Sequence, residues 1–317
     1  MSTPGGGTGG GSDGEWSMGM AGRRLRALMD AGCVSAPGAF NGLVARAAKA
    51  AGFEALYVSG AAVSASAGLP DVGLVTLEGF CRVIGEVARA SGLPVLADAD
   101  TGFGEGEMTA RSVWEYARAG AAGMHIEDQV FPKRCGHLDG KSLVSVEHMQ
   151  EKVHSAAKAR DAHTAGRFIV CARTDARSVD GLEAAIARAK AYVDSGADMI
   201  FPEGLHSEEE FAAAARALKG YGSANGPYLL ANMTEFGKTP IIPVSRFADM
   251  GYSIVIFPVS SLRSAMGEVE RLFAALRRDG HVNGVINQML DRKNLYGLLG
   301  YEPGREWEFP GLGANKR

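Results

Sequence analysis

Residues 95–128 read VLADADTGFGEGEMTARSVWEYARAGAAGMHIED, and they contain one complete unit of the pattern that decides the fold. A short apolar run, Val95–Ala97, precedes acidic residues and the helical stretch Glu107–Ala119, and a second apolar run, Gly123–Ile126, follows. Apolar runs this short, with no alternation of polar residues, are typical of buried parallel strands. Gly120 directly after the helical stretch suits the position that ends a helix. The unit therefore predicts strand, helix and parallel strand.

The same unit recurs along the chain. The apolar runs are Cys33–Ala36, Ala55–Val58, Val95–Ala97, Gly123–Ile126, Phe168–Ala172, Met199–Phe201, Tyr228–Ala231 and Ile254–Phe257. Ala-rich helical stretches such as Glu183–Ser195 and Ser207–Leu218 lie between them. Eight alternations favour an α/β fold of the (β/α)8 TIM barrel type, with an open doubly wound sheet as the alternative that counting alone leaves open.

Polar residues follow most of these runs. They are Ser59, Gly60, Asp98, Asp100, Glu127, Asp128, Arg173, Glu203, Asn232 and Thr234. In a barrel these positions converge on the C-terminal mouth, where the active sites of such barrels lie. This convergence is the strongest argument for the barrel.

Length and composition set the domain plan. The 317 residues suit one barrel with additions, which we place at 21–300, after a flexible Gly-rich tail at 1–20 and before an irregular tail at 301–317. Two further helical stretches, Ser261–Asp279 and Val282–Leu299, exceed what a barrel needs. We expect this surplus to pack on a partner subunit or to cap the barrel.

Composition also excludes several classes of protein. The formal charge of -3 gives no basic surface for nucleic acid. No apolar run is long enough to span a membrane, and the N-terminus has no signal-peptide core, so we expect a cytoplasmic protein. The four cysteines form no CxxC pair, which argues against a zinc ribbon or a thioredoxin-type site.

Asp98 and Asp100 are the candidate metal ligands. Side chains at i and i+2 on a strand point the same way, so both carboxylates can address one ion. Oxygen ligands without His or Cys favour Mg²⁺, with Mn²⁺ also possible. The alternative is a turn, where Asp before Gly is common. Glu127 and Asp128 at the end of the next strand favour the metal site.

Cys135 is the candidate reactive thiol. It lies in residues 131–137, FPKRCGH, a stretch with cationic neighbours and no apolar periodicity. Such surroundings lower a thiol pKa, so Cys135 can act as a general acid or as a nucleophile. His137 in the same loop is the better histidine candidate, whereas His125 within its apolar run is more typical of a core residue. Cys171 is interpreted as core.

Arg173 follows a buried strand. It must either pair with a protein carboxylate, such as that of Asp175 or Glu203, or clamp a carboxylate of a ligand. Arg263 and Arg292 are weaker candidates for the same role, and the position of Arg292 near the C-terminus is more typical of a surface residue.

Together these residues resemble the isocitrate lyase and phosphoenolpyruvate mutase superfamily, and within it the 2-methylisocitrate lyases. The resemblance covers about Arg23 to Tyr301, and its most specific piece is the Lys-Arg-Cys-Gly-His loop at 133–137. The other matching pieces are Tyr57–Gly60, Gly68–Asp71, Asp98–Gly104, His125–Gln129, Ala172–Asp175, Phe201–Glu203, Ala231–Phe236 and Arg292–Tyr296.

The resemblance implies a homotetramer in which the last helix is exchanged between subunits. It also implies that Asp98 and Asp100 hold Mg²⁺ and that Cys135, Tyr57 and His137 are catalytic. Its implied substrate-binding residues are Ser59, Gly60, Ala61, Cys135, Gly136, Arg173, Glu203, Asn232, Thr234, Arg263 and Arg292. Ala61 departs from the glycine common at this position.

The implied reaction is Mg²⁺-dependent cleavage of 2-methylisocitrate to pyruvate and succinate, with Cys135 protonating the departing carbanion and Tyr57 as the base. Phe201 and the compact length favour methylisocitrate over isocitrate. The alternatives are an isocitrate lyase, a 2,3-dimethylmalate or alkylmalate lyase, and an oxaloacetate decarboxylase, the last of which the loop cysteine disfavours. A binding protein without activity would require the polar rim to be incidental.

Overall fold

The computed structural model describes residues 18–134 and 140–307. Within them, eight parallel strands form one sheet in the order β1-β8-β7-β6-β5-β4-β3-β2. A parallel bridge between Gly38 and Tyr57 joins β1 to β2, so the sheet curves round into a barrel. The strands are β1 (Val34–Pro37), β2 (Leu56–Val58), β3 (Val95–Asp98), β4 (Gly123–Glu127), β5 (Ile169–Thr174), β6 (Met199–Pro202), β7 (Tyr228–Asn232) and β8 (Ile254–Phe257). The predicted (β/α)8 barrel is confirmed.

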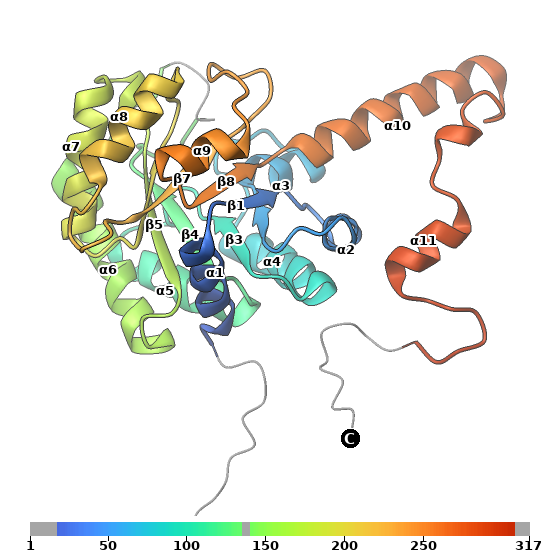
Figure 1. The fold of residues 1–317 in the computed structure, drawn as a ribbon. Coiled ribbons are helices and arrows are strands. Elements are labelled where there is room, and N and C mark those ends of the chain that lie inside the picture. Colours follow the sequence, from blue (N-terminus) through green and yellow to red (C-terminus); the bar gives the residue numbers. More distant parts are fainter. Residues whose placement is uncertain (1–17, 135–139, 308–317) are drawn as a thin grey trace, which may run out of the picture.

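Helices alternate with the strands and cover the outside of the barrel (Figure 1). They are α1 (Met20–Ala31), α2 (Gly42–Ala50), α3 (Gly60–Ser66), α4 (Leu77–Ser91), α5 (Gly106–Ala119), α6 (Val146–Thr164), α7 (Leu182–Asp194), α8 (Glu208–Leu218), α9 (Val244–Met250), α10 (Ser260–Asp279) and α11 (Arg292–Leu299), with 3-10 turns at Ala176–Ser178 and Ile286–Gln288. Side-chain caps start several of them: Ser145, for example, accepts a hydrogen bond from the backbone N–H of His148 at 3.1 Å.

The core has two parts. Inward-facing side chains such as Leu96, Met199 and Ile254 fill the barrel, and outward-facing ones pack under the helices. Leu25 and Met29 of α1 join the inner cluster, so α1 closes the N-terminal end of the barrel. The opposite end, at the carboxyl ends of the strands, is left for polar side chains.

The C-terminal helices do not pack like the others. α10 projects away from the barrel in Figure 1. Among its 20 residues only Ala275 is buried, and α11 has no buried residue. The single predicted helix Val282–Leu299 is wrong: a 3-10 turn and a separate α11 occupy this region, because Asp291 caps a new helix by accepting from the backbone N–H of Asn294 at 2.8 Å. Residues 301–307 contain no helix or strand.

Candidate active site

A cavity of about 70 Å³ lies at the carboxyl ends of the barrel strands. Nine of the residues predicted from the sequence line it: Tyr57, Ser59, Ala61, Asp98, Arg173, Glu203, Asn232, Thr234 and Arg263. Phe201, Asp71 and Lys133 line it as well. The barrel therefore brings together side chains from β2, β3, β5, β6 and β7 that are far apart in the chain.

Asp98 and Asp100 meet, but not for the reason the sequence indicated. β3 ends at Asp98, and Asp100 lies beyond it with a φ of 45°, so strand alternation does not align the two side chains. A turn brings them together: the backbone N–H of Asp100 donates to Asp98 Oδ1 at 3.0 Å. Left-handed backbone in a residue other than glycine is strained, and it is often found at functional sites.

Gly60 lies against the carboxylates of Asp98 and Asp100, where a larger residue would not fit. Its backbone N–H donates to Asp98 Oδ2 at 3.0 Å. A Cβ at this position would lie 2.7 Å from Asp98 Oδ2 and 3.3 Å from Asp100 Oδ1. Both carboxylates thus reach the N-terminus of α3, and only glycine fits between the helix and the acids.

Lys133 is buried against these acids. Its ammonium lies 2.8 Å from Asp100 Oδ1 and also pairs with Asp71. Burial raises the pKa of Asp100 to about 6, and the negative charge of Asp98 adds to that rise although Lys133 opposes it. The acids therefore carry more negative charge than one lysine balances. Buried carboxylate oxygens with spare negative charge fit a hard divalent cation that keeps some of its water.

The described residues offer few side-chain ligands for a metal ion. Among residues 18–134 and 140–307, no group of three or more His, Cys, Asp or Glu side chains is placed to hold a metal ion. Two aspartates match Mg²⁺, which is commonly held through one or two carboxylates, with water and substrate oxygens filling the other positions.

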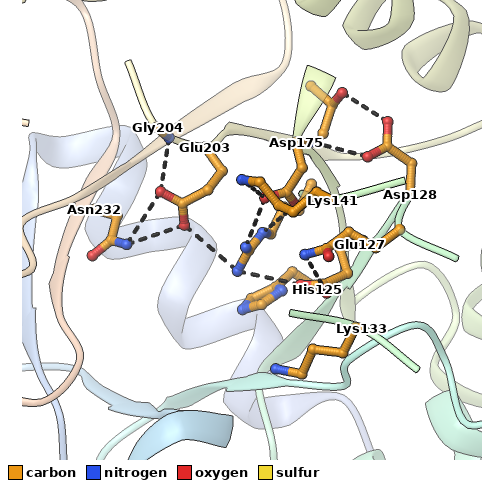
Figure 2. A network of polar contacts seen from close by, with 12 residues as sticks. His125, Glu127, Asp128, Lys133, Lys141, Asp175, Glu203, Gly204 and Asn232 are labelled. Carbon is orange, nitrogen blue, oxygen red and sulfur yellow. Dashed lines mark hydrogen bonds and ion pairs between the residues drawn. The ribbon is translucent and has the colours of Figure 1, made fainter. Parts of the chain in front are cut away.

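Arg173 contacts three buried carboxylates, those of Glu127, Asp175 and Glu203. Figure 2 shows these three acidic side chains close together. The Arg173 guanidinium donates to both oxygens of Asp175, at 2.9 and 3.1 Å. Another nitrogen lies 3.3 Å from Glu127 Oε2 and 3.5 Å from Glu203 Oε2. Lys141 pairs with Asp175 at 2.7 Å from the far side. Burial opposes the ionisation of Asp175, but the Arg173 and Lys141 charges outweigh it and lower the pKa of that carboxyl.

Of the two sequence-based alternatives for Arg173, pairing with protein carboxylates is observed. The side chain also lines the cavity, where it packs 5.2 Å over the ring of Phe201. The second alternative, a clamp on a ligand carboxylate, stays a prediction.

Glu203, which follows β6, organises the part of the cavity wall next to Arg173. Its carboxylate accepts from the backbone N–H of Gly204 at 2.8 Å and from Asn232 Nδ2 at 3.1 Å. Thr234 then donates its hydroxyl to Asn232 Oδ1 at 3.0 Å. These contacts fix the amide orientation of Asn232 and leave polar groups of both residues along the cavity.

Tyr57 is held by His125, a residue that we interpreted as core. The phenol oxygen and His125 Nε2 share a hydrogen bond of 2.6 Å, and His125 Nδ1 lies 3.7 Å from Asp98 Oδ1. Burial lowers the pKa of His125 to about 4, so the imidazole is neutral at pH 7. Burial and the Asp98 charge raise the pKa of Tyr57 well above its ordinary value, so the phenol keeps its proton.

The sequence reasoning thus missed His125, Lys133 and Asp71 as site residues. A signal for His125 was present: it is two residues before Glu127 on β4, so both side chains point into the barrel. Asp71 and Lys133 lie on loops, where no periodicity places a side chain.

The remaining predicted residues are placed differently. Arg263 lines the cavity on its exposed rim and pairs with Glu235. Arg292 begins α11, is exposed and does not line the cavity of its own chain. Cys135, Gly136 and His137 lie outside the described residues, so their roles stay predictions.

Comparison with known proteins identifies the family of this chain. Residues 25–277 match the family described as phosphoenolpyruvate phosphomutase. A 2-methylisocitrate lyase of Aeropyrum pernix is 47% identical over 269 residues, which cover 84% of this chain and 83% of the relative. The 2-methylisocitrate lyase of Bacillus subtilis is 44% identical and covers 88% and 89%.

Solved structures agree. The crystal structure of a 2,3-dimethylmalate lyase has a TM-score of 0.80 at 38% identity, covering 88% of this chain and 91% of that one. A phosphonopyruvate hydrolase in complex with oxalate and Mg²⁺ has a TM-score of 0.77 at 30% identity, covering 88% and 95%. The chain therefore belongs to the phosphoenolpyruvate mutase and isocitrate lyase superfamily.

Proposed function

We propose that this chain cleaves the C2–C3 bond of 2-methylisocitrate to give pyruvate and succinate. The observation that carries the proposal is a cavity lined by both Asp98 and Arg173, with Asp100 bonded to Asp98 directly beside it. Relatives named 2-methylisocitrate lyase at 44–47% identity support this choice of substrate.

The divalent cation is part of the proposal. Asp98 and Asp100 would hold it, and we propose Mg²⁺, with Mn²⁺ as a substitute. When bound, it would act as a Lewis acid that stabilises charge on the 2-hydroxy acid end of the substrate. Support comes from the buried oxygen donors and the excess of negative charge around Lys133. A superfamily relative crystallised with oxalate and Mg²⁺ adds to it.

The other residues of the site would bind the carboxylates of the substrate. Arg173 supplies a positive charge that its three acidic neighbours keep in place. Asn232 and Thr234, at the end of β7, offer hydrogen bonds to the substrate. Ser59, Gly60 and Ala61 form the start of α3 and would bind a substrate carboxylate there. Glu203 binds indirectly, by fixing Asn232.

Proton transfer is assigned to two groups. Cys135, on the loop that begins next to Lys133, protonates the carbanion left on the succinate fragment, and His137 assists it. Tyr57 is the proposed base. Its phenol carries a proton and is hydrogen-bonded to the neutral His125, so Tyr57 can take the hydroxyl proton of the substrate while its own proton passes to His125 Nε2.

Substrate choice depends on the cavity walls. Phe201 lies against Arg173 and against His125, with ring centroids 5.4 Å apart in an edge-to-face contact. A single methyl group is worth about 1–3 kcal/mol in such a pocket, so isocitrate is the nearest competitor. The dimethylmalate lyase among the solved relatives makes 2,3-dimethylmalate the second candidate.

We also propose a homotetramer in the cytoplasm. α10 and α11 carry exposed apolar side chains, among them Phe273 at 62% and Leu276 at 37% exposure, that α10 does not bury against its own barrel. No helix in the described part of the chain is long and apolar enough to cross a membrane. No nucleic-acid or membrane partner is proposed.

The test is a panel of hydroxy acids with purified enzyme and Mg²⁺. We expect pyruvate from 2-methylisocitrate, little glyoxylate from isocitrate, and loss of both when EDTA is added, with recovery on adding Mg²⁺ or Mn²⁺. Cys135→Ser should abolish cleavage while pyruvate still binds. Faster turnover of 2,3-dimethylmalate than of 2-methylisocitrate would assign the second candidate instead.

A further inference from the structure

A second hollow, of about 720 Å³, lies beside the catalytic cavity and shares no lining residue with it. Its walls come from the loop before α4, the loop between β3 and α5, the residues after β4, and one face of α6. This volume is in the range of small-molecule sites in proteins. We call it the α6 groove.

Lys152 of α6 lines this groove and is only 5% exposed. It makes no hydrogen bond or ion pair with any residue of the described chain. The other charged residues of the groove are paired: Arg111 with Glu78 at 3.2 Å, and His148 with Glu105. Lys152 Nζ is not among the fully buried polar atoms without a partner, so the ammonium is open to the groove although the rest of the side chain is buried. An anion in the groove would therefore meet a charge that no protein group pairs.

Burial lowers the pKa of Lys152, and the Glu105 charge only partly opposes this. The carboxylate of Glu105 is 70% exposed and bonded to His148, so it neutralises Lys152 poorly. The charge requirement of the groove is therefore a single negative group near Lys152.

Apolar side chains form another part of the groove wall. Leu74 is 53% exposed, Val130 44% and Phe131 61%, although all three are large hydrophobic residues. Met108 and Val144 continue the same wall. Exposed apolar side chains gathered around one hollow indicate a ligand with an apolar body.

The groove wall also reaches the catalytic side chains. Gln129 lines the groove and donates to Glu127 Oε1 at 2.9 Å. Its amide also bonds both backbone groups of Arg134, at 3.0 and 2.8 Å, next to Lys133. Thr101, another wall residue, directly follows Asp100. Contacts of the groove wall thus connect it to Glu127 and to the chain segment next to Lys133.

We propose that the α6 groove is an effector site for an aliphatic monocarboxylate, with Lys152 pairing to the carboxylate and Leu74, Val130 and Phe131 covering the chain. The site is separate from the one at which the substrate binds. Its ligand changes the affinity of the catalytic cavity through Gln129.

Octanoate is the first probe, with octanol and acetate as probes that lack the charge or the chain. We expect octanoate to bind with one site per chain in calorimetry and to bind more tightly than either control. Lys152→Met should weaken binding by about tenfold or more, because a charge-assisted contact is lost. Lys158→Met, on an exposed position of the same helix, should leave it unchanged.

A second variant, outside α6, tests the site in case Lys152→Met disturbs the structure of that helix. Leu74→Glu alters an exposed wall residue, so folding should persist, and its carboxylate should compete with octanoate for Lys152. Octanoate that does not saturate, or that binds equally to wild type and Lys152→Met, overturns the site.

The binding experiment requires no turnover, so its result does not depend on the proposed lyase activity. The effector role is tested by the KM of the lyase reaction with and without octanoate. A change in wild type that disappears in Lys152→Met supports coupling, since two linked sites must alter each other's affinity. An unchanged KM with octanoate bound refutes it.

Discussion

Replacing Arg173 tests the central network most directly. Arg173→Met removes a cation that contacts Asp175, Glu127 and Glu203, and leaves a side chain of similar length. Lys141 remains paired with Asp175 in this variant. Arg173→Lys keeps the charge but loses the fork that bonds both oxygens of Asp175.

The size of the effect follows from burial. Arg173 is only 7% exposed, and the three carboxylates are buried with it. Removing one partner of a buried ion pair costs about 3–5 kcal/mol, because the other partner stays behind without its counter-charge. For a domain of this size that lowers the melting temperature by on the order of 10 °C. Arg173→Lys should lose less than half of this.

The deficit should depend on pH. Burial already raises the pKa of Glu127 well above its ordinary value, with Arg173 and Lys133 opposing the rise. Without Arg173 that pKa rises further in the folded state. A carboxyl group with a raised folded pKa costs nothing below its unfolded pKa and reduces stability as pH rises above it. The gap between wild type and Arg173→Met should therefore widen as pH rises above the folded-state pKa that Glu127 has in wild type.

The assay is thermal unfolding of wild type, Arg173→Met and Arg173→Lys by circular dichroism at pH 5, 6.5 and 8. Pyruvate binding, measured by calorimetry, reports the clamp separately. A Met variant that melts within about 2 °C of wild type at every pH would refute the reasoning, because the three carboxylates would then not depend on Arg173.

Three further predictions use other parts of the structure. Gly60→Ala places a methyl group 2.7 Å from Asp98 Oδ2, so a Mn²⁺ titration should show about tenfold or more weaker metal binding in a folded protein, and equal affinity would contradict the crowding. Burial raises the pKa of Cys33 and Cys81 to about 11, so iodoacetamide at pH 8 should label the loop cysteine first in a mass-spectrometric time course, and equal labelling of Cys33 would contradict this. Phe273→Asp on α10 should dissociate the proposed tetramer in light scattering, whereas an unchanged mass would show that this face is not an interface.

Some residues of the site could be predicted from the sequence because they lie at the ends of strands. Arg173, Glu203 and Asn232 each come at the end of an apolar run, and parallel strands must deliver such residues to one face. Lys133 and Asp71 could not be predicted in this way, because loops have no periodicity that fixes a side chain. The meeting of Asp98 and Asp100 was predicted, but by strand alternation, whereas a left-handed turn produces it.

Residues 95–128, like the other strand–helix units, determined by themselves that buried parallel strands would alternate with helices, since that pattern is local in sequence. Closure of the sheet into a barrel, rather than an open sheet, is seen in the tertiary structure. Only the tertiary structure decided which side chains are in contact. Tyr57 and His125 lie 68 positions apart, and Lys133 and Asp71 lie 62 apart, yet each pair is in direct contact. Such contacts depend on barrel closure and on the dehydration of charges within it, and both properties arise only when all the strands are in place.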